Sequence, residues 1–326
     1  MHDGITTYPG VLDVIQQLRQ ANKELIILSN SSKRQDNSIK VLTKLGFKPD
    51  DDFTKILTSG EVSYQLLRAA SSGSDDADIN LTPKPWPVLD EVDGTGVFCF
   101  GSGDGDEEYI ESAGWKLTTM DKAQCILSRG TFAISDGVNP TTHKKHDGED
   151  AYFKRLETEL QIAAQRKLPM IVANPDKIRP DADRSPMPGQ IGDAYEKELR
   201  KVSENNPEDL VKRIGKPFSD VYEIALREGN EGSMGNKKRV CMIGDALETD
   251  VTGGTFQDID TIWVINDGIH NVAVEEQMKM YDNNGDRTAA FSKACHDVVH
   301  EFNQQTGTYA KDQLLRPTLI VPHFRW

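Results

Sequence analysis

Residues 240–250 read VCMIGDALETD, and this stretch decides the fold. Its apolar start predicts a strand buried on both faces, and Gly244 and Asp245 follow at the carboxyl end of that strand. Asp250 comes five residues after Asp245. Ligands of open α/β sheets bind at the carboxyl ends of strands, so both carboxylates are expected at a binding site. Aspartate also caps helices after such turns, and the motif alone is therefore moderately specific.

Apolar runs of the same kind recur along the chain and alternate with helical patterns. Strands are predicted at residues 25–28, 56–57, 97–100, 125–127, 170–173 and 261–265. Helical patterns at 9–18, 34–45 and 61–70 fit crossover helices of a parallel sheet. Residues 71–96 are rich in Ser, Asp, Gly and Pro and read as a linker. We therefore predict an α/β fold, a Rossmann-like parallel sheet core interrupted by an inserted α/β domain.

Length and charge limit the classes of partner. A chain of 326 residues suits two domains or one domain with a large insertion. The formal charge of −14 disfavours a nucleic-acid backbone or an anionic membrane as the main partner. No apolar stretch is long enough to span a bilayer, and the start lacks a signal-peptide pattern, so a cytoplasmic protein is expected. The four cysteines form no CxxC pair and are expected to be reduced thiols.

A lysine in a constrained turn is the second chemical signal. Lys216 stands between Gly215 and Pro217, and Pro217 suits the first turn of a following helix. The lysine could neutralise a phosphoryl group and the carboxylate that reacts with it. A surface lysine at a helix start would give the same short motif, and for the motif alone that reading is favoured.

A hydroxyl and an amide follow the first predicted strand. Residues 28–32 read LSNSS, so Ser29 and Asn30 lie where the strand ends. Together with the backbone N–H groups of the next residues, they could form a phosphate cradle. Capping of the following helix by Ser or Asn is the alternative.

The order of these signals identifies a family resemblance. The chain resembles the haloacid dehalogenase (HAD) superfamily, subclass IIA, whose phosphatases carry a large α/β cap between the second and third motifs. The resemblance covers nearly the whole chain. It rests on segments in matching order and spacing: TYPGVLDVIQQL (7–18), LSNSS (28–32), LTSGE (57–61), ANPD (173–176), PGQIGDAYE (188–196), IGKPF (214–218) and IGDALETD (243–250).

The resemblance implies a domain layout and roles for individual residues. Residues 1–94 and 206–326 would form the HAD core, and residues 95–205 the inserted cap. Ser29 and Asn30 would bind phosphate, and Lys216 would steady the phosphoryl group. Asp245 would ligate magnesium, the implied cofactor, and Asp250 would support the site.

The cap also supplies candidates. Asn174 and Asp176 match the cap segment that faces the active site in the family, so they are expected to contact substrate. Family members also dimerise through the cap, so a homodimer is a further expectation.

The chain departs from the family at its start. Members open with a buried strand that ends in an aspartate nucleophile, followed within a few residues by Gly-Val and then His-Asp-Gly. Residues 1–4 read MHDG, which resembles the end of that motif. Asp3 has no strand before it and reads as a turn residue. We expect the nucleophile and its central strand to lie upstream of Met1. Residues 1–326 alone are not expected to catalyse the turnover of a substrate.

The leading function is a magnesium-dependent phosphomonoesterase that works through an aspartyl-phosphate intermediate on a small phosphorylated metabolite. A non-catalytic HAD-fold protein with a binding or regulatory role is the alternative. Another HAD chemistry, such as carbon–halogen or phosphonate cleavage, is a third. The identity of the substrate depends on cap side chains and cannot be read from the sequence.

Overall fold

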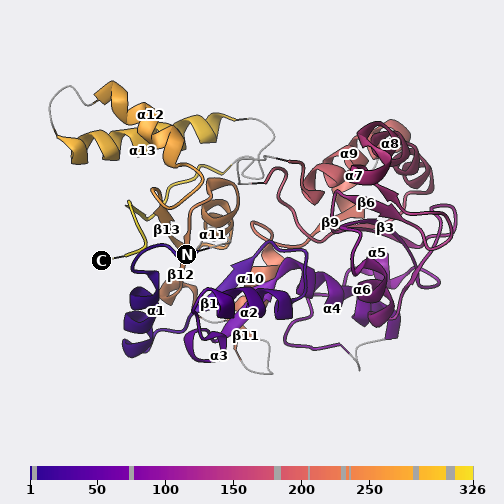
Figure 1. Cartoon of the computed structure of the whole chain (residues 1–326), viewed down its shortest axis with the longest axis horizontal. Helices are drawn as coiled ribbons and strands as arrows, with labels where there is room; N and C mark the ends of the chain where they lie inside the picture. The colour runs from indigo at the N-terminus through magenta and orange to yellow at the C-terminus, as the bar shows by residue number, and fades with distance from the viewer. Residues whose placement is uncertain are drawn as a thin grey trace.

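A computed structural model of the chain describes residues 1, 6–72, 77–179, 185–204, 206–228, 233–234, 236–281, 286–305 and 313–325. The predicted α/β class is confirmed, because helices alternate with strands and every strand pair of the two core sheets is parallel. Figure 1 shows one α/β unit at the left, called the core below, and a second one at the right, residues 96–213, called the cap. Asp3 lies outside the described residues.

The first part of the core is a parallel pair of strands with three helices. Its elements are α1 (Val11–Gln20), β1 (Ile26–Ser29), α2 (Gln35–Lys44), α3 (Pro49–Asp52) and β2 (Lys55–Thr58). Helix α1 begins after Gly10, whose φ of 79° lies in the left-handed region. It buries Val11, Val14 and Ile15, which share one face at helical spacing.

The second part of the core is a three-stranded parallel sheet in the order β12-β13-β14. Its elements are β12 (Cys241–Gly244), the π-helical turn η4 (Leu247–Val251), α11 (Thr252–Phe256), β13 (Asp260–Val264), α12 (Asn271–Tyr281), α13 (Arg287–Gln304) and β14 (Leu319–Val321). Helix α10 (Ser219–Ala225) comes before them in the chain and contacts β1 and β2 of the first part. Helices α12 and α13 form a hairpin above this sheet in Figure 1. Trp263 and Phe302 are buried in the cluster that joins sheet and hairpin.

The cap is built on a seven-stranded sheet in the order β7-β6-β3-β5-β8-β9, with β4 paired to β3. Its elements are β3 (Gly96–Gly101), α6 (Asp106–Ser112), β4 (Lys116–Leu117), β5 (Cys125–Ser128), β6 (Ala133–Ser135), β7 (Thr142–His143), α7 (Lys144–Asp147), α8 (Glu149–Arg166), β8 (Met170–Val172), α9 (Pro188–Val202) and β9 (Val211–Arg213). Strands β3, β5, β8 and β9 are parallel neighbours, so their carboxyl ends share one edge. Strand β9 follows residue 206, where the return to the core was expected, yet it pairs with β8.

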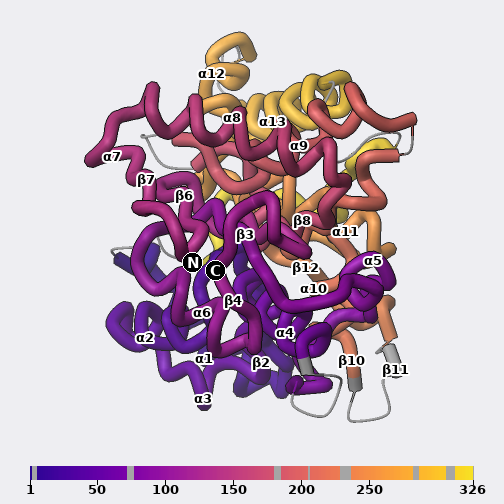
Figure 2. The backbone as a smooth tube through the Cα atoms, turned by 90° about the vertical axis from the view of Figure 1, so that its right-hand side faces the viewer, coloured from indigo at the N-terminus to yellow at the C-terminus, as the bar shows by residue number. Residues whose placement is uncertain are grey.

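Helix α4 (Ser59–Ser72) joins the two units (Figure 2). It starts directly after core strand β2 and packs, with α6, on one face of the cap sheet, while α8 and α9 cover the other face. The indole of Trp115 donates to the carbonyl of Leu67 at 2.6 Å, and the hydroxyl of Tyr64 donates to the carbonyl of Ser112 at 2.8 Å. Core and cap therefore share one continuous hydrophobic cluster at this junction.

Within the described part of the chain, two core strands have an edge without a neighbouring strand. Among the described strands, β1 pairs only with β2, and β12 pairs only with β13. All residues of β1 are half-buried, and Cys241 at the start of β12 is exposed. The sequence predicted that these two strands are buried on both faces. That prediction was wrong, because β1 is half-buried and β12 is half-buried or exposed. A strand buried on both faces of a parallel sheet needs neighbours at both edges and helices over both faces.

The remaining expectations concern the linker, the cysteines and the membrane. Within residues 71–96, α4 continues to Ser72 and a short helix α5 (Pro87–Asp90) forms. All four cysteines are free, and three of them are buried. In the part of the chain that the structure describes, no helix combines the length and apolarity that a bilayer span requires.

Candidate active site

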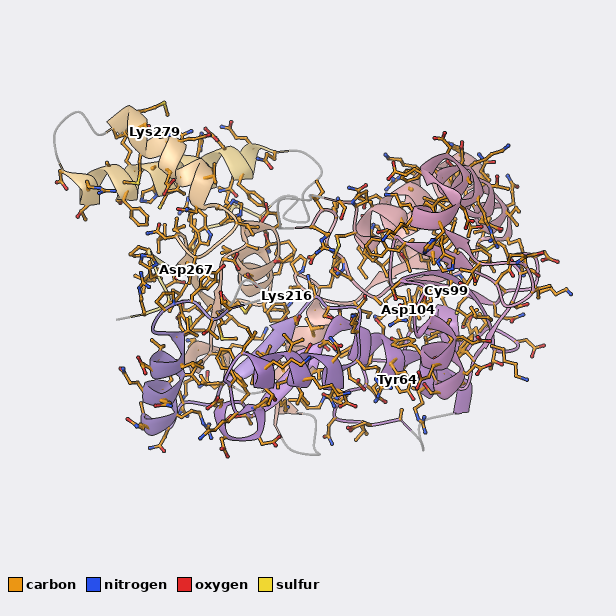
Figure 3. All side chains as sticks on the ribbon, viewed as in Figure 1. Tyr64, Cys99, Asp104, Lys216, Asp267 and Lys279 are labelled. Carbon is orange, nitrogen blue, oxygen red and sulfur yellow. The ribbon has the colours of Figure 1, made fainter. Side chains whose placement is uncertain are left out.

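The loops after β1, β8, β9 and β12 meet between the core and the cap. Lys216 lies at this meeting point, in the middle of the molecule in Figure 3. All four loops follow the carboxyl ends of parallel strands, which is where α/β sheets bind ligands.

Lys216 is held by Asp250. Its Nζ donates to Oδ1 of Asp250 at 2.7 Å, and the two side chains are 14% and 6% exposed. Oδ2 of Asp250 accepts from the backbone N–H groups of Asp245 and Ala246, both at 3.1 Å. Burial alone would lower the pKa of Lys216, but the charge and hydrogen bond of Asp250 outweigh it, so the pKa is raised. The lysine is therefore a fixed positive charge.

Asn30 connects the first core strand to Lys216 and to the cap. Its Oδ1 accepts from the backbone N–H of Lys216 at 2.7 Å, and its Nδ2 donates to the carbonyl of Lys216 at 2.9 Å. The same Nδ2 donates to Oδ1 of Asp176 at 2.8 Å. Gly215, with φ of 131°, permits this approach, because a Cβ there would lie 2.6 Å from Oδ1 of Asn30. The amide of Asn30 is thus engaged in positioning Lys216.

The loop after β1 is held by the start of α4. Oγ of Ser29 accepts from the N–H of Ser31 at 3.3 Å, and the carbonyl of Ser31 accepts from Oγ of Ser59 at 3.0 Å and the N–H of Gly60 at 2.8 Å. Gly60 is required by this contact, since a Cβ there would lie 2.3 Å from the carbonyl oxygen of Ser32. The sequence did not predict that α4 shapes the phosphate-cradle loop.

Asp245 lies at the carboxyl end of β12, as predicted. Its Oδ2 accepts from the backbone N–H of Ile269 at 3.0 Å, and its carbonyl accepts from the indole of Trp263 at 3.0 Å. Burial, followed by the negative charge of Asp250, raises the pKa of Asp245. Sequence reasoning missed the residues that hold this carboxylate, because the donor from Ile269 is a backbone N–H that any residue type could supply.

The two cap candidates have different surroundings. Asn174 is 4% exposed, and its Oδ1 accepts from the N–H of Asp176 at 2.8 Å, so it shapes the turn. Asp176 reaches the core through Asn30. Burial raises the pKa of Asp176 to about 6, against the opposing effects of Asn30 and Lys216.

This raised pKa predicts a pH-dependent stability. Between pH 4 and pH 7 the folded state binds more protons at Asp176 than the unfolded state, so the free energy of unfolding falls as pH rises. Asp176→Asn should remove this fall, which is on the order of 2 kcal/mol. Urea unfolding at several pH values measures it, with Asp104→Asn, an exposed carboxylate, as control. An unchanged pH dependence in Asp176→Asn would contradict the prediction.

The side chains of the cluster carry a net negative charge, which favours the binding of a metal cation. One lysine stands against three aspartates, Asp176, Asp245 and Asp250, so a phosphate dianion alone would meet net repulsion. Among the described residues no group of three or more His, Cys, Asp or Glu forms a complete metal site. The donor set suits a hard cation that keeps several waters and takes one or two carboxylates, as magnesium does. Asp245, whose Oδ2 accepts a backbone N–H at 3.0 Å, fits that role.

The fold and the site together define an α/β protein whose polar cluster lies at the carboxyl ends of parallel strands, between its two α/β units. A family model for haloacid dehalogenase-like hydrolases matches residues 1–116, and a second HAD-hydrolase-like model matches residues 213–289. Together they cover more than half of the chain. The chain belongs to the haloacid dehalogenase-like hydrolases, a family of enzymes, as the sequence motifs indicated.

Individual relatives agree with this assignment. Human chronophin is 24% identical over 260 residues, which span 77% of this chain and 73% of chronophin. A possible sugar phosphatase from Cytophaga hutchinsonii has a similar structure (TM-score 0.60, 18% identity, 98% of this chain and 88% of that one). A p-nitrophenyl phosphatase from Archaeoglobus fulgidus also has a similar structure (TM-score 0.51, 22% identity, 81% of this chain and 83% of that one). At these identities the structures support the fold alone.

Proposed function

We propose that the protein is a magnesium-dependent phosphomonoester hydrolase that works through an aspartyl-phosphate intermediate. The observation that carries the proposal is the Lys216–Asp250 pair, 2.7 Å apart and tied by Asn30 to the loop after β1. The names of two structural neighbours, a p-nitrophenyl phosphatase and a possible sugar phosphatase, support the same reaction class.

The proposed roles follow from these contacts. Ser29 and the backbone N–H groups after it bind the phosphoryl oxygens. Asn30, expected from the family to bind phosphate, instead orients Lys216 through its amide. Lys216 stabilises the negative charge that develops on the phosphoryl group. Asp250 holds the lysine and the turn at Asp245.

Magnesium would be held by Asp245 and by waters. When bound, it supplies charge neutralisation on the phosphoryl oxygens. Asp245 is preorganised for this by the N–H of Ile269, which fixes the orientation of its carboxylate. Asp250 is committed to Lys216 and to two backbone donors, so it supports the site without needing to bind the cation directly.

The proposed nucleophile is an aspartate on a further parallel strand. The open edges of β1 and β12 would accept such a strand between them, which would bring its carboxyl end beside Ser29 and Asp245. The aspartate attacks phosphorus in line and the alcohol leaves. Water then attacks the acyl phosphate and releases inorganic phosphate. This part of the proposal rests on the edges of β1 and β12 that have no partner among the described strands.

The cap is proposed to select the substrate. Residues 95–205 remain the proposed cap domain, although β9 (Val211–Arg213), which follows it in the sequence, pairs with β8 at the edge of the same sheet. Asn174 shapes the turn that presents Asp176, whose carboxylate reaches the same cluster as Lys216. The proposed substrate is a small phosphorylated metabolite in the cytoplasm, and a homodimer through the cap remains a proposal.

The experiment is hydrolysis of p-nitrophenyl phosphate, with and without magnesium, by residues 1–326 and by a chain extended upstream in its reading frame. We expect magnesium-dependent turnover in the extended chain and none in residues 1–326. Asp250→Asn in the extended chain is expected to lower kcat, since it releases Lys216. Turnover in neither chain would favour a non-catalytic binding protein, and an upstream frame without a strand and aspartate would remove the proposed nucleophile.

A further inference from the structure

A histidine with no role in the proposed chemistry contacts the turn that carries Asp245 and Asp250. His270 ends the loop of residues 265–270, between β13 and α12, and its side chain is 13% exposed. Its Nε2 lies 3.2 Å from the backbone nitrogen of Leu247, which donates to it, and 3.0 Å from Oε2 of Glu248. The imidazole therefore connects two loops that both follow carboxyl ends of core strands.

The N–H of Leu247 depends on an acceptor from outside its own turn. Leu247 begins the π-helical turn η4, so its N–H is one of the first donors of a helix, which have no partner within the helix itself. The N-cap residue is Ala246, whose side chain has no acceptor. Leu247 is fully buried, so water does not replace the missing partner. The imidazole of His270 takes the place of the N-cap side chain.

His270 is one of several contacts between the two loops. The indole of Trp263 donates to the carbonyl of Asp245, and the backbone N–H of Ile269 donates to Oδ2 of Asp245, both at 3.0 Å. Ile269 directly precedes His270, whose ring packs edge-on against Trp263 with 5.6 Å between the ring centroids. The side chain of His270 therefore helps to fix the backbone N–H that orients the carboxylate of Asp245.

Asp250 secures the same turn from within. Its Oδ2 accepts from the N–H groups of Asp245 and Ala246. Together with the contact of His270 to Leu247, three successive backbone N–H groups are bound by two side chains. Loss of His270 would leave the bonds of Asp250 in place but would release the turn from the neighbouring loop.

Both charge states of the imidazole hold the turn. A neutral imidazole with its proton on Nδ1 accepts from Leu247 through Nε2, whereas a protonated one donates from Nε2 to Glu248. The side chain of Glu248 is 47% exposed, and an exposed pair stabilises little. The hydrogen bond from the buried N–H of Leu247 is therefore the contact that matters most.

We propose that His270 is a positioning residue for the magnesium site. The inference rests on the proposed function, in which Asp245 binds the cation. His270 ties the turn of Asp245 to the loop of Ile269 and so holds the carboxylate in the orientation that the N–H of Ile269 sets. Loss of such an outer contact typically weakens metal binding 10–100-fold, so about tenfold is expected here.

Three substitutions of His270 separate its acceptor from its ring. His270→Phe keeps an aromatic ring beside Trp263 and removes Nε2. His270→Gln puts an amide, which both accepts and donates, at the reach of Nε2, whereas the shorter His270→Asn reaches only as far as Nδ1. Isothermal titration of residues 1–326 with magnesium chloride should show about tenfold weaker binding in His270→Phe and His270→Asn, and binding within about twofold of the wild type in His270→Gln.

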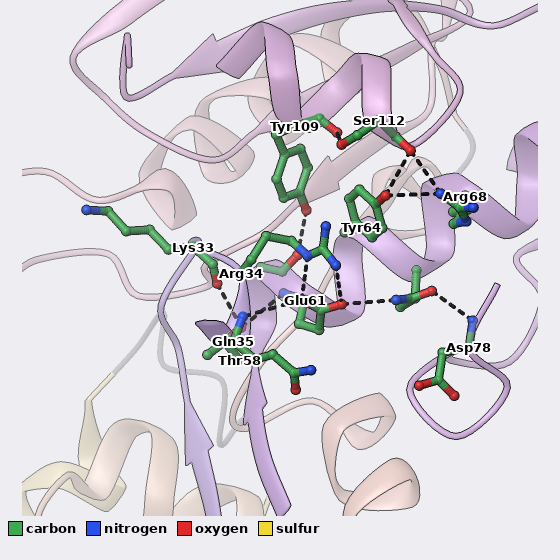
Figure 4. Close-up of polar contacts among 12 residues, drawn as sticks. Lys33, Arg34, Gln35, Thr58, Glu61, Tyr64, Arg68, Asp78, Tyr109 and Ser112 are labelled. Carbon is green, nitrogen blue, oxygen red and sulfur yellow. Dashed lines mark hydrogen bonds and ion pairs between the residues drawn. The ribbon is translucent and has the colours of Figure 1, made fainter. Parts of the chain in front are cut away.

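Tyr64→Phe is the matched control. The hydroxyl of Tyr64 donates to the carbonyl of Ser112 at 2.8 Å, where α4 meets the cap (Figure 4). Like His270→Phe, this substitution removes a side chain-to-backbone hydrogen bond and keeps a ring. Tyr64 lies across the molecule from Asp267, a residue of the His270 loop (Figure 3), so magnesium affinity should match that of the wild type. Thermal unfolding checks that each variant folds.

Hydrogen exchange of the metal-free chain tests the contact itself. The amide of Leu247 should exchange faster in His270→Phe than in the wild type, because its acceptor is gone, and His270→Gln should restore the protection. Equal protection of this amide in His270→Phe would overturn the contact on which the inference depends.

Each outcome of the titrations supports or overturns a defined claim. Equal magnesium affinity in the wild type and His270→Phe overturns the positioning role and leaves the proposed function standing. A loss in His270→Gln as large as that in His270→Phe overturns the assignment to the Nε2 acceptor. A loss of the same size in Tyr64→Phe shows an unspecific effect and overturns the positioning role. No magnesium binding by the wild type overturns the magnesium site of the proposed function together with this inference.

Discussion

Replacing Lys216 with methionine is expected to remove both activity and a large part of the stability. Methionine keeps the apolar stem but leaves Asp250, 6% exposed, without its ion-pair partner. Breaking a buried pair in this way costs about 3–5 kcal/mol. Because two backbone N–H groups still donate to Asp250, the lower end of that range is expected. Urea unfolding of residues 1–326 measures the change.

A double-mutant cycle isolates the interaction energy of the Lys216–Asp250 ion pair. Asp250→Asn in the Lys216→Met background removes the stranded charge and should recover a large part of the lost stability. Lys212→Met is the control, since Lys212 lies on β9, the strand that precedes Lys216, and pairs with Asp220. Additive effects of the two site substitutions would contradict the assigned ion pair.

The catalytic effect of Lys216→Met is measured in the upstream-extended chain. Loss of one preorganised charge donor to the reacting group should lower kcat about 10²–10³-fold. Lys212→Met should leave kcat within about twofold of the unsubstituted chain, as expected for a residue outside the site. A kcat in Lys216→Met that matches this control would show that the lysine does not act on the reacting phosphoryl group.

Replacing Asp245 with asparagine is expected to lower the activity and to raise the free energy of unfolding. The pKa of Asp245 is raised by burial and by the charge of Asp250, so its ionised form costs stability at pH 7. Asparagine keeps an acceptor for the N–H of Ile269 and removes the charge. The free energy of unfolding at pH 7 should rise, while turnover in the extended chain falls at least ~10²-fold.

Thermal unfolding with magnesium gives an independent measure of the same residue. A ligand that binds the folded state alone raises the melting temperature, so magnesium should stabilise the wild-type chain but not Asp245→Asn. Asp258→Asn, an exposed carboxylate in the turn before β13, is the control and should respond like the wild type. An equal magnesium response in Asp245→Asn would exclude Asp245 as the ligand.

The strands, and the polar residues at their carboxyl ends, could be predicted from local sequence patterns. Continuous apolar runs indicate strands inside an α/β fold, and the polar residues directly after them lie at the shared carboxyl edge. That rule predicted Asp245 and Asp250 at the site. Lys216 follows β9, a strand that the sequence analysis did not predict, and its place in the site was implied by the family resemblance. The family resemblance added the role of each residue.

The contacts that fix those residues could not be predicted in the same way. Asn30 bonds to Asp176 across 146 residues and to Lys216 across 186, and both contacts depend on how the cap sheet meets the core. The donor to Asp245 is a backbone N–H, which no residue type encodes.

The most direct test of the central claim is acid quenching of the upstream-extended chain during turnover of a phosphomonoester with magnesium, followed by mass spectrometry of its peptides. The account predicts one phosphoryl group on an aspartate of the strand that pairs between β1 and β12, with its amount reduced by Lys216→Met. A phosphoryl group on another residue, or turnover without a phosphorylated protein, would contradict it.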